Sequence, residues 1–126
     1  MTGAENSDDR SARAGRRAGP TQAATDSAAI ASQVGQATGQ LGAHLADPAV
    51  AHTVEEIEQI TRGFSEAADG MARGLGGVTE WLRATGHPVP LSGHSSVVAD
   101  RLLHAGRELT RLAEALARAE RDDQAG

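Results

Sequence analysis

Two histidine–carboxylate pairs have the spacing of metal ligands on one helix. His44 and Asp47 are three residues apart, and Asp100 and His104 are four apart. Groups at these spacings share a helical face, so each pair could offer two ligands to a metal ion. A four-ligand site would need both pairs to meet, but the helical arrangement derived below keeps them well apart. We therefore interpret them as solvated surface residues and expect no metal ligand.

A short serine–histidine segment has part of the pattern of a hydrolase nucleophile turn. It reads Gly93-His94-Ser95-Ser96-Val97, and the pattern requires glycine where Val97 stands, together with a preceding strand. We interpret the segment as a helix cap instead. The chain has no cysteine and no lysine, which excludes thiol catalysis and a phosphate-binding P-loop. We expect no catalytic residue and no cofactor.

The composition allows one small domain with a thin core. The chain has 126 residues and a net charge of −5, and 25 of its residues are alanine. Leu, Ile, Val and Phe together contribute only 21 residues, below the usual globular level. All 12 basic residues are arginine, a bias typical of high-GC bacterial coding. We find neither a signal peptide nor a membrane-spanning stretch and expect a cytoplasmic protein.

Helix-capping residues, prolines and glycines divide the chain into three predicted helices between two tails. Residues 1–22 lack large apolar residues after Met1, which predicts a disordered tail, and residues 122–126 are expected to fray. Thr25 or Asp26 is a candidate cap for the first helix. The second helix is expected to begin at Asp47-Pro48 or at Thr53. The helices are predicted at about 25–46, 48–84 and 96–121, with a loop at 85–94.

Apolar residues repeat with alternating spacings of three and four along all three helices. This heptad pattern is typical of a coiled-coil seam and predicts an all-α, antiparallel, up-down-up three-helix bundle over residues 23–121. A kink or break of the second helix is plausible at Gly74–Gly77. The predicted core comprises Val54, Ile57, Phe64, Met71, Leu75, Leu102, Leu109 and Leu112.

Glycines at heptad spacing define a second candidate packing face. Each interior glycine costs a helix about 1 kcal/mol relative to alanine, so a regular row needs an explanation. The row either allows close helix association or reflects coding drift. Trp81 lies nearby and either caps the core under residues 89–91 or contacts a partner. The candidate interaction face comprises Gly35, Gly42, Gly63, Gly70, Gly77 and Trp81.

Arginines form two clusters that could meet phosphate groups. One lies in the tail and the other forms an outward strip on the third helix. The strip is equally explained by pairing with acidic residues of the second helix. Acidic residues also interleave with the strip, and only two aromatics are present for base stacking. The candidate nucleic-acid contacts are Arg10, Arg13, Arg16, Arg17, Arg107, Arg111 and Arg118.

The sequence thus predicts a non-enzymatic interaction or scaffold protein. The long seam, the glycine rows and the thin core favour a homo-oligomer or binding to a helical protein partner, because small cores often need association for stability. The alternative is a small nucleic-acid-associated accessory or regulatory protein that uses the arginine clusters.

Overall fold

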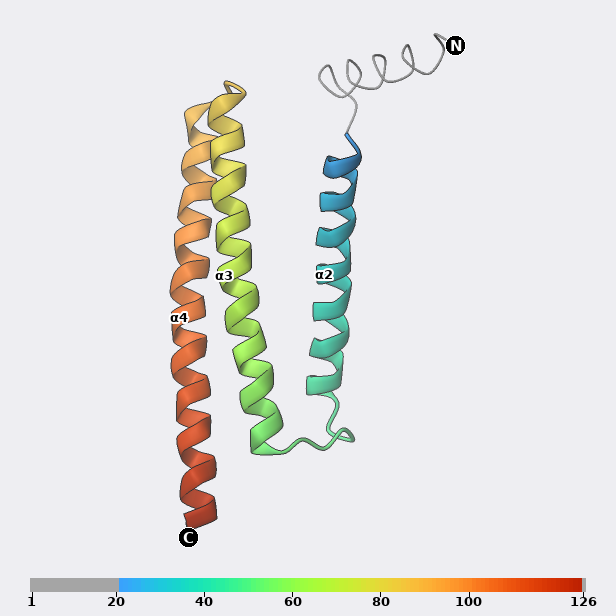
Figure 1. Cartoon of the computed structure of the whole chain (residues 1–126), viewed down its shortest axis with the longest axis vertical. Coiled ribbons are helices and arrows are strands. Elements are labelled where there is room, and N and C mark those ends of the chain that lie inside the picture. Colours follow the sequence, from blue (N-terminus) through green and yellow to red (C-terminus); the bar gives the residue numbers. More distant parts are fainter. Residues whose placement is uncertain (1–20, 126) are drawn as a thin grey trace, which may run out of the picture. The chain divides into compact units, whose positions relative to one another are not determined.

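The computed structural model describes residues 21–125, and this part of the chain is all-α. Three helices follow one another: α2 (Gln22–Ala46), α3 (Val54–Ala84) and α4 (Val89–Ala125) (Figure 1). The predicted fold class is therefore confirmed, since the described residues contain helices and no strand. The predicted disorder of residues 1–22 falls almost wholly outside the described residues. None of the three helices combines the length and hydrophobicity that crossing a bilayer requires.

The chain divides into two units, Met1–Ala51 and His52–Gly126, and each is described by itself. The recorded contacts between helices join α3 and α4, which run side by side in opposite directions (Figure 1). Antiparallel packing is thus confirmed for this pair. The packing of α2 against the pair stays a prediction.

Helix α2 begins earlier than the sequence indicated. Its N-cap is Thr21, whose hydroxyl accepts a hydrogen bond from the Ala24 amide at 3.1 Å. The expected caps, Thr25 and Asp26, lie within the helix. Because Thr21 satisfies an amide that has no partner within the helix, the first turn forms four residues ahead of Thr25.

Helix α3 begins at the second of the two predicted sites. The Thr53 hydroxyl accepts a hydrogen bond from the Glu56 amide at 3.1 Å, which makes Thr53 the N-cap. The start at residue 48 is therefore wrong. Asp47 instead closes a turn, in which its carboxylate accepts from the Ala49 amide and its carbonyl from the Val50 amide. The helix is continuous through Gly74–Gly77, without the break considered above.

The predicted ten-residue loop before α4 is only a tight turn. Gly86 has a φ of 73°, its amide donates to the Arg83 carbonyl, and the His87 amide donates to the Leu82 carbonyl. This is a Schellman C-cap, which favours glycine at the left-handed position. Pro88 and Pro90 then fit at the start of α4, where amides need no helical partner. The interpretation of Ser95 or Ser96 as a cap is wrong, because α4 already runs from Val89 to Ala125.

The core between α3 and α4 is made of small side chains. The buried hydrophobic residues are Ala68, Ala72 and Ala113, and no large side chain is fully buried among the described residues. The predicted core of large residues is therefore wrong in part: Val54, Met71 and Leu112 are exposed, whereas Ile57, Phe64, Leu75, Leu102 and Leu109 are half-buried. Small residues therefore form the contact between α3 and α4, and the large hydrophobic residues lie beside this contact.

Candidate protein-interaction surface

Buried hydroxyl groups join α3 to α4 at two levels. The Ser65 hydroxyl donates to the Gly106 carbonyl at 2.9 Å and lies 2.7 Å from the Thr110 hydroxyl. Nearer the turn, the hydroxyls of Thr79 and Ser95 lie 2.6 Å apart. A side chain as short as serine reaches a backbone carbonyl on another helix only when the two helices approach closely. The hydroxyl contacts therefore fix both the spacing and the register of the pair.

Gly106 lies where the two helices approach each other closely. A Cβ atom built on it would lie 2.6 Å from an Asp69 carboxylate oxygen and 3.5 Å from the Ala68 Cβ. Gly106 and Ala113 are both buried and lie one heptad apart on α4. Small buried residues of α3, including Ala68 and Ala72, lie on the opposite side of the contact. Since these positions hold small residues on both helices, large side chains cannot lie between the backbones.

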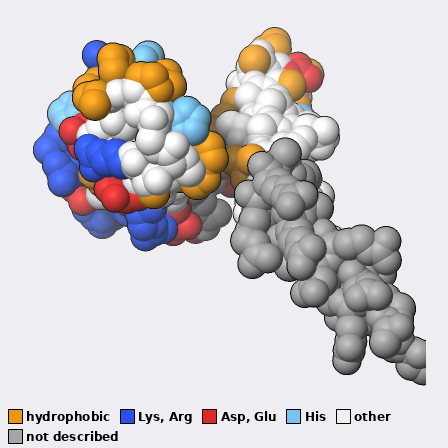
Figure 2. Space-filling view, turned by 90° about the horizontal axis from the view of Figure 1, so that it is seen from above, with side chains coloured by type: hydrophobic (Ala, Val, Ile, Leu, Met, Phe, Trp, Pro, Cys, Tyr) orange, Lys and Arg blue, Asp and Glu red, His pale blue; other side chains and the backbone are white. Residues whose placement is uncertain are grey.

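One side of the α3–α4 pair carries charged and polar side chains. Arg62, Ser65 and Glu66 of α3 line a shallow groove together with Thr110 of α4. Arg62 pairs with Glu58 at 2.9 Å on the same side. In the end-on view of Figure 2, charged side chains gather on one flank of the pair, away from the larger hydrophobic groups. This side is called the charged side below.

The opposite side presents the large hydrophobic residues of both helices. Helical periodicity places these residues across the seam from the charged side. Three of them are exposed, with Met71 46%, Val78 44% and Leu112 51% exposed. We call this side the apolar face and define it by Ile60, Phe64, Met71, Val78, Val98, Leu102, Ala105, Leu109, Leu112 and Leu116.

The glycines of the predicted interaction face border this surface. Gly63, Gly70 and Gly77 have open space where a Cβ would be. By helical periodicity they lie at the outer edge of α3, beyond the apolar face. Gly35 and Gly42 of α2 are equally open. No packing partner occupies these positions within either unit, so their role in association stays a prediction.

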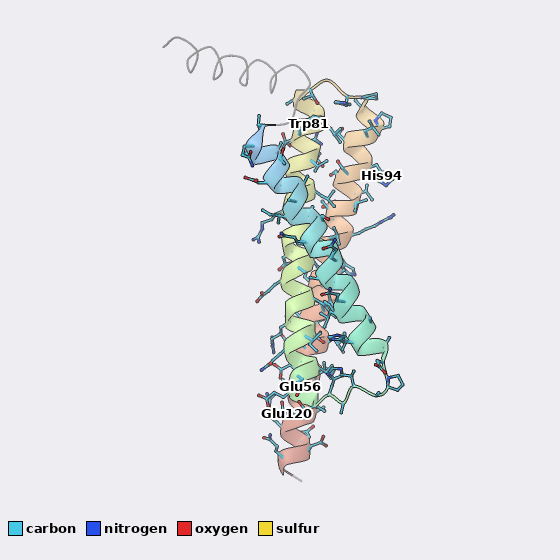
Figure 3. The ribbon with its side chains drawn as sticks, turned by 90° about the vertical axis from the view of Figure 1, so that its right-hand side faces the viewer. Glu56, Trp81, His94 and Glu120 are labelled. Carbon is cyan, nitrogen blue, oxygen red and sulfur yellow. The ribbon has the colours of Figure 1, made fainter. Side chains whose placement is uncertain are left out.

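Trp81 does not cap the core. Its side chain is 58% exposed, and its ring lies 5.1 Å from that of His87, centroid to centroid. The turn between α3 and α4 is too short to fold over it. Trp81 and His94 lie at the turn end of the pair, while Glu56 and Glu120 lie toward the other (Figure 3).

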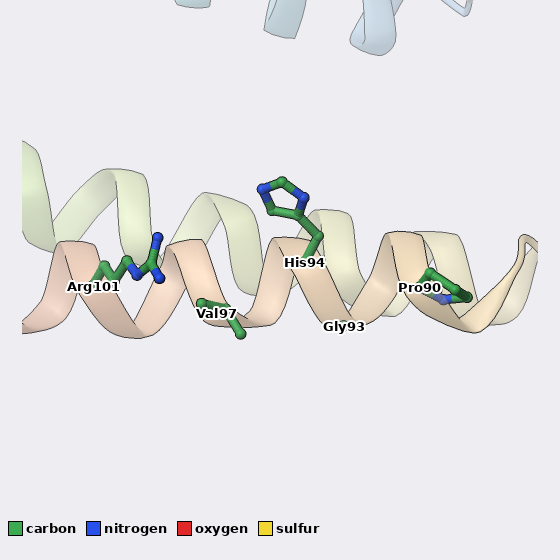
Figure 4. A pocket seen from close by; sticks show the side chains of 5 residues that line it. All are labelled: Pro90, Gly93, His94, Val97 and Arg101. Carbon is green, nitrogen blue, oxygen red and sulfur yellow. The ribbon is translucent and has the colours of Figure 1, made fainter.

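Two histidines of the second unit each lie beside a single carboxylate of α3 or α4. His104 is 3.8 Å from Glu108, and His52 is 3.5 Å from Glu56, with both distances measured from ring nitrogen to carboxylate oxygen. No group of three potential metal ligands gathers within residues 21–125. His94 and Arg101 border an open hollow of about 420 Å³ on the outside of α4 (Figure 4). Exposed side chains on one helix surround this hollow without enclosing it.

The arginine strip of α4 is only partly available to a ligand. Arg111 pairs with Glu108 of its own helix. The ion pairs recorded in the described part of the chain all lie within one helix or at its N-terminus. The expected pairing of the strip with acidic residues of α3 is therefore not observed. Arg10, Arg13, Arg16 and Arg17 lie outside the described residues, whereas Arg107, Arg111 and Arg118 lie on α4.

The apolar face and the register of the hydroxyls are features that sequence reasoning missed. Their signal was present as a second heptad row, Ser65, Ala72 and Thr79, one position from the row of Phe64, Met71 and Val78. Hydrophobicity alone favoured the row of Phe64, Met71 and Val78 for the core. Comparison of the chain with protein-family models, with curated proteins and with solved structures gave no match.

Proposed function

We propose that this chain is a non-enzymatic interaction protein that binds a second protein surface through the apolar face of the α3–α4 pair. The observation that carries the proposal is the separation of small and large residues around the contact between α3 and α4. Small residues join the two helices, while large hydrophobic residues lie together on one side, where Met71, Val78 and Leu112 are exposed and their large neighbours are half-buried. Contiguous exposed apolar surface of this kind commonly marks a protein interface.

The energetics of the pair support the same proposal. Three alanines form its buried hydrophobic core, and alanine removes little apolar area from water on folding. A small domain with so little core usually needs association or another staple to be stable. Covering the apolar face would bury the Phe, Met, Val and Leu side chains that the seam leaves open. Association would then complete the core.

Two leucines of α4 provide a matched test. Leu112 lies on the apolar face and is 51% exposed, whereas Leu103 lies across the helix on the charged side and is 40% exposed. We expect Leu112→Asp to lower the mass of the assembly, measured by size exclusion with light scattering, because a buried charge there has no partner. Leu103→Asp is the control and should leave the mass unchanged.

The same experiment separates a self-assembly from a complex with another protein. The full chain should exceed its monomer mass of 12.9 kDa if it assembles with itself. Equal masses for both leucine variants and the parent chain, at concentrations where the parent associates, would contradict the proposed role of the apolar face. Circular dichroism of each variant checks that helicity is retained.

A further inference from the structure

The apolar face has the size of a stable dimer interface. Together with the half-buried Ile57, Leu75 and Leu82 that border it on α3, the face follows that helix for about 38 Å, at 1.5 Å per residue. Two helices packed about 8–10 Å apart present a surface roughly 20 Å wide. The resulting area of roughly 750 Å² per copy is close to the roughly 800 Å² per partner that a standard stable interface buries.

The edges of the face limit what can cover it. Along α3, the edge runs from Ile60 through Gly63, Ala67, Gly70 and Gly74 without a charged residue. Along α4, the edge carries one charge of each sign, on Arg101 and Glu108. No ion pair involving Arg101 is recorded in the described residues. A partner therefore suits this face when it is uncharged opposite α3 and offers an acid opposite Arg101 and a base opposite Glu108, whose carboxylate also pairs with Arg111 of its own helix.

A second copy of the same face meets this requirement when it is turned end over end. In a twofold pairing, residue i meets residue j and residue j meets residue i. Antiparallel pairing of α4 with its copy, centred near Ala105, sets Arg101 of each copy opposite Glu108 of the other. Both charges then gain an oppositely charged neighbour at the rim of the interface.

A twofold axis at the level of Ala105 on α4 also suits α3. The hydrogen bonds between the two helices show which residue of α3 lies at that level. The hydroxyl contacts place Ser65 at the level of Thr110, and Thr79 at the level of Ser95. Interpolation puts Met71 at the height of His104 and Ala105, to within about one turn. An antiparallel α3–α3 pairing centred on Met71 sets Phe64 opposite Val78, and the small residue Ala67 within one residue of the level of Gly74.

We infer that the apolar face binds the same face of a second copy in an antiparallel, twofold four-helix assembly, with Met71 near the axis and Arg101 opposite Glu108 of the partner subunit. This inference rests on the proposed function and identifies the partner as the chain itself. The pairing of Arg101 with Glu108 of the partner subunit lies at the rim of α4, whereas the two copies of α3 contact each other around Met71. The charge pairing and the α3–α3 contact can therefore be tested separately.

Cysteine cross-linking tests the position of the axis. The chain has no cysteine, so Met71→Cys introduces a single thiol that lies beside its copy across the axis. We expect mild oxidation to convert most of this variant to a disulfide-linked dimer, seen on non-reducing gels. Arg73→Cys is the control, because Arg73 lies on the charged side of the same helix and should remain largely uncross-linked.

Charge exchange tests the direction of pairing. Arg101→Glu and Glu108→Arg should each raise the dimer dissociation constant about three- to tenfold at low salt, since each places like charges together. The double variant Arg101→Glu/Glu108→Arg restores opposite charges across the twofold and should recover most of the parent affinity. Sedimentation equilibrium measures all three constants.

The outcomes distinguish this inference from the proposed function. A parent chain that stays monomeric up to hundreds of micromolar overturns the inference and assigns the face to another occupant. Association that is lost with Leu112→Asp but shows neither Met71 cross-linking nor charge rescue overturns the twofold pairing while leaving the apolar face as the interaction surface. Cross-linking at Met71 together with rescue by the double variant supports the inference.

Discussion

The hydroxyl of Ser65 donates a hydrogen bond to the backbone carbonyl of Gly106 across the α3–α4 seam, at 2.9 Å. Thr110 donates to the same carbonyl at 3.1 Å and lies 2.7 Å from the Ser65 oxygen. Three groups on two helices thus share one buried junction. In the described residues, no buried side-chain nitrogen or oxygen lacks a hydrogen-bond partner, so hydrogen bonds within the small-residue seam offset the cost of burying its polar groups.

The first prediction concerns this junction. We expect Ser65→Ala to lower the free energy of unfolding by about 1 kcal/mol, because it removes a cross-helix hydrogen bond. Thr110→Val should cost a similar amount. A double-mutant cycle measured by urea denaturation should show coupling of about 0.5 kcal/mol or more, since the two hydroxyls are in contact. Strictly additive effects would contradict the shared junction.

The second prediction tests the small-residue seam against the core of large residues that the sequence indicated. Ala113 is 0% exposed, so Ala113→Leu must separate the helices. We expect a loss of about 1–3 kcal/mol in unfolding free energy from overpacking. Ala115→Leu, at an exposed position two residues away, is the control and should change stability by about 0.5 kcal/mol or less. Equal effects at both positions would argue against the seam.

The positions of the seam and of the helix starts show where sequence reasoning stops. Heptad spacing predicted three helices and the α3–α4 pairing, because the spacing depends only on local geometry. It could not choose between adjacent rows, such as Phe64–Met71 and Ser65–Ala72. That choice depends on what faces each row, and Gly106 and Ala113 on α4 favour close approach of small residues. Local caps were equally ambiguous, with Asp47 and Thr53 both able to start a helix.

The third prediction concerns the turn between α3 and α4. Gly86 has a φ of 73°, a conformation that costs other residues roughly 1–2 kcal/mol. Gly86→Ala should therefore lower the unfolding free energy by about 1 kcal/mol. Gly93→Ala is the matched control: Gly93 lies within α4 with open space around its Cβ position. This substitution should instead stabilise the chain by roughly 0.5–1 kcal/mol through helix propensity.

The fourth prediction concerns nucleic acid. We expect the full chain to show no measurable binding to duplex DNA by fluorescence anisotropy at 150 mM salt, because acidic residues interleave with the α4 arginines and Arg111 already pairs with Glu108. Binding that falls steeply with added salt and disappears on deletion of residues 1–20 would instead favour a nucleic-acid-associated function.

The last prediction separates two roles for the glycine row of α3. Gly70 has open space around its Cβ position, so Gly70→Ala should fit the α3–α4 pair and stabilise it by about 1 kcal/mol through helix propensity. Gly70→Leu adds a branched side chain at the edge of the apolar face. If the row lets a partner approach closely, Gly70→Leu should lower the assembly mass in light scattering while circular dichroism shows unchanged helicity. An unchanged mass for Gly70→Leu would indicate that the row has no part in association and that the large hydrophobic residues beside it form the contact.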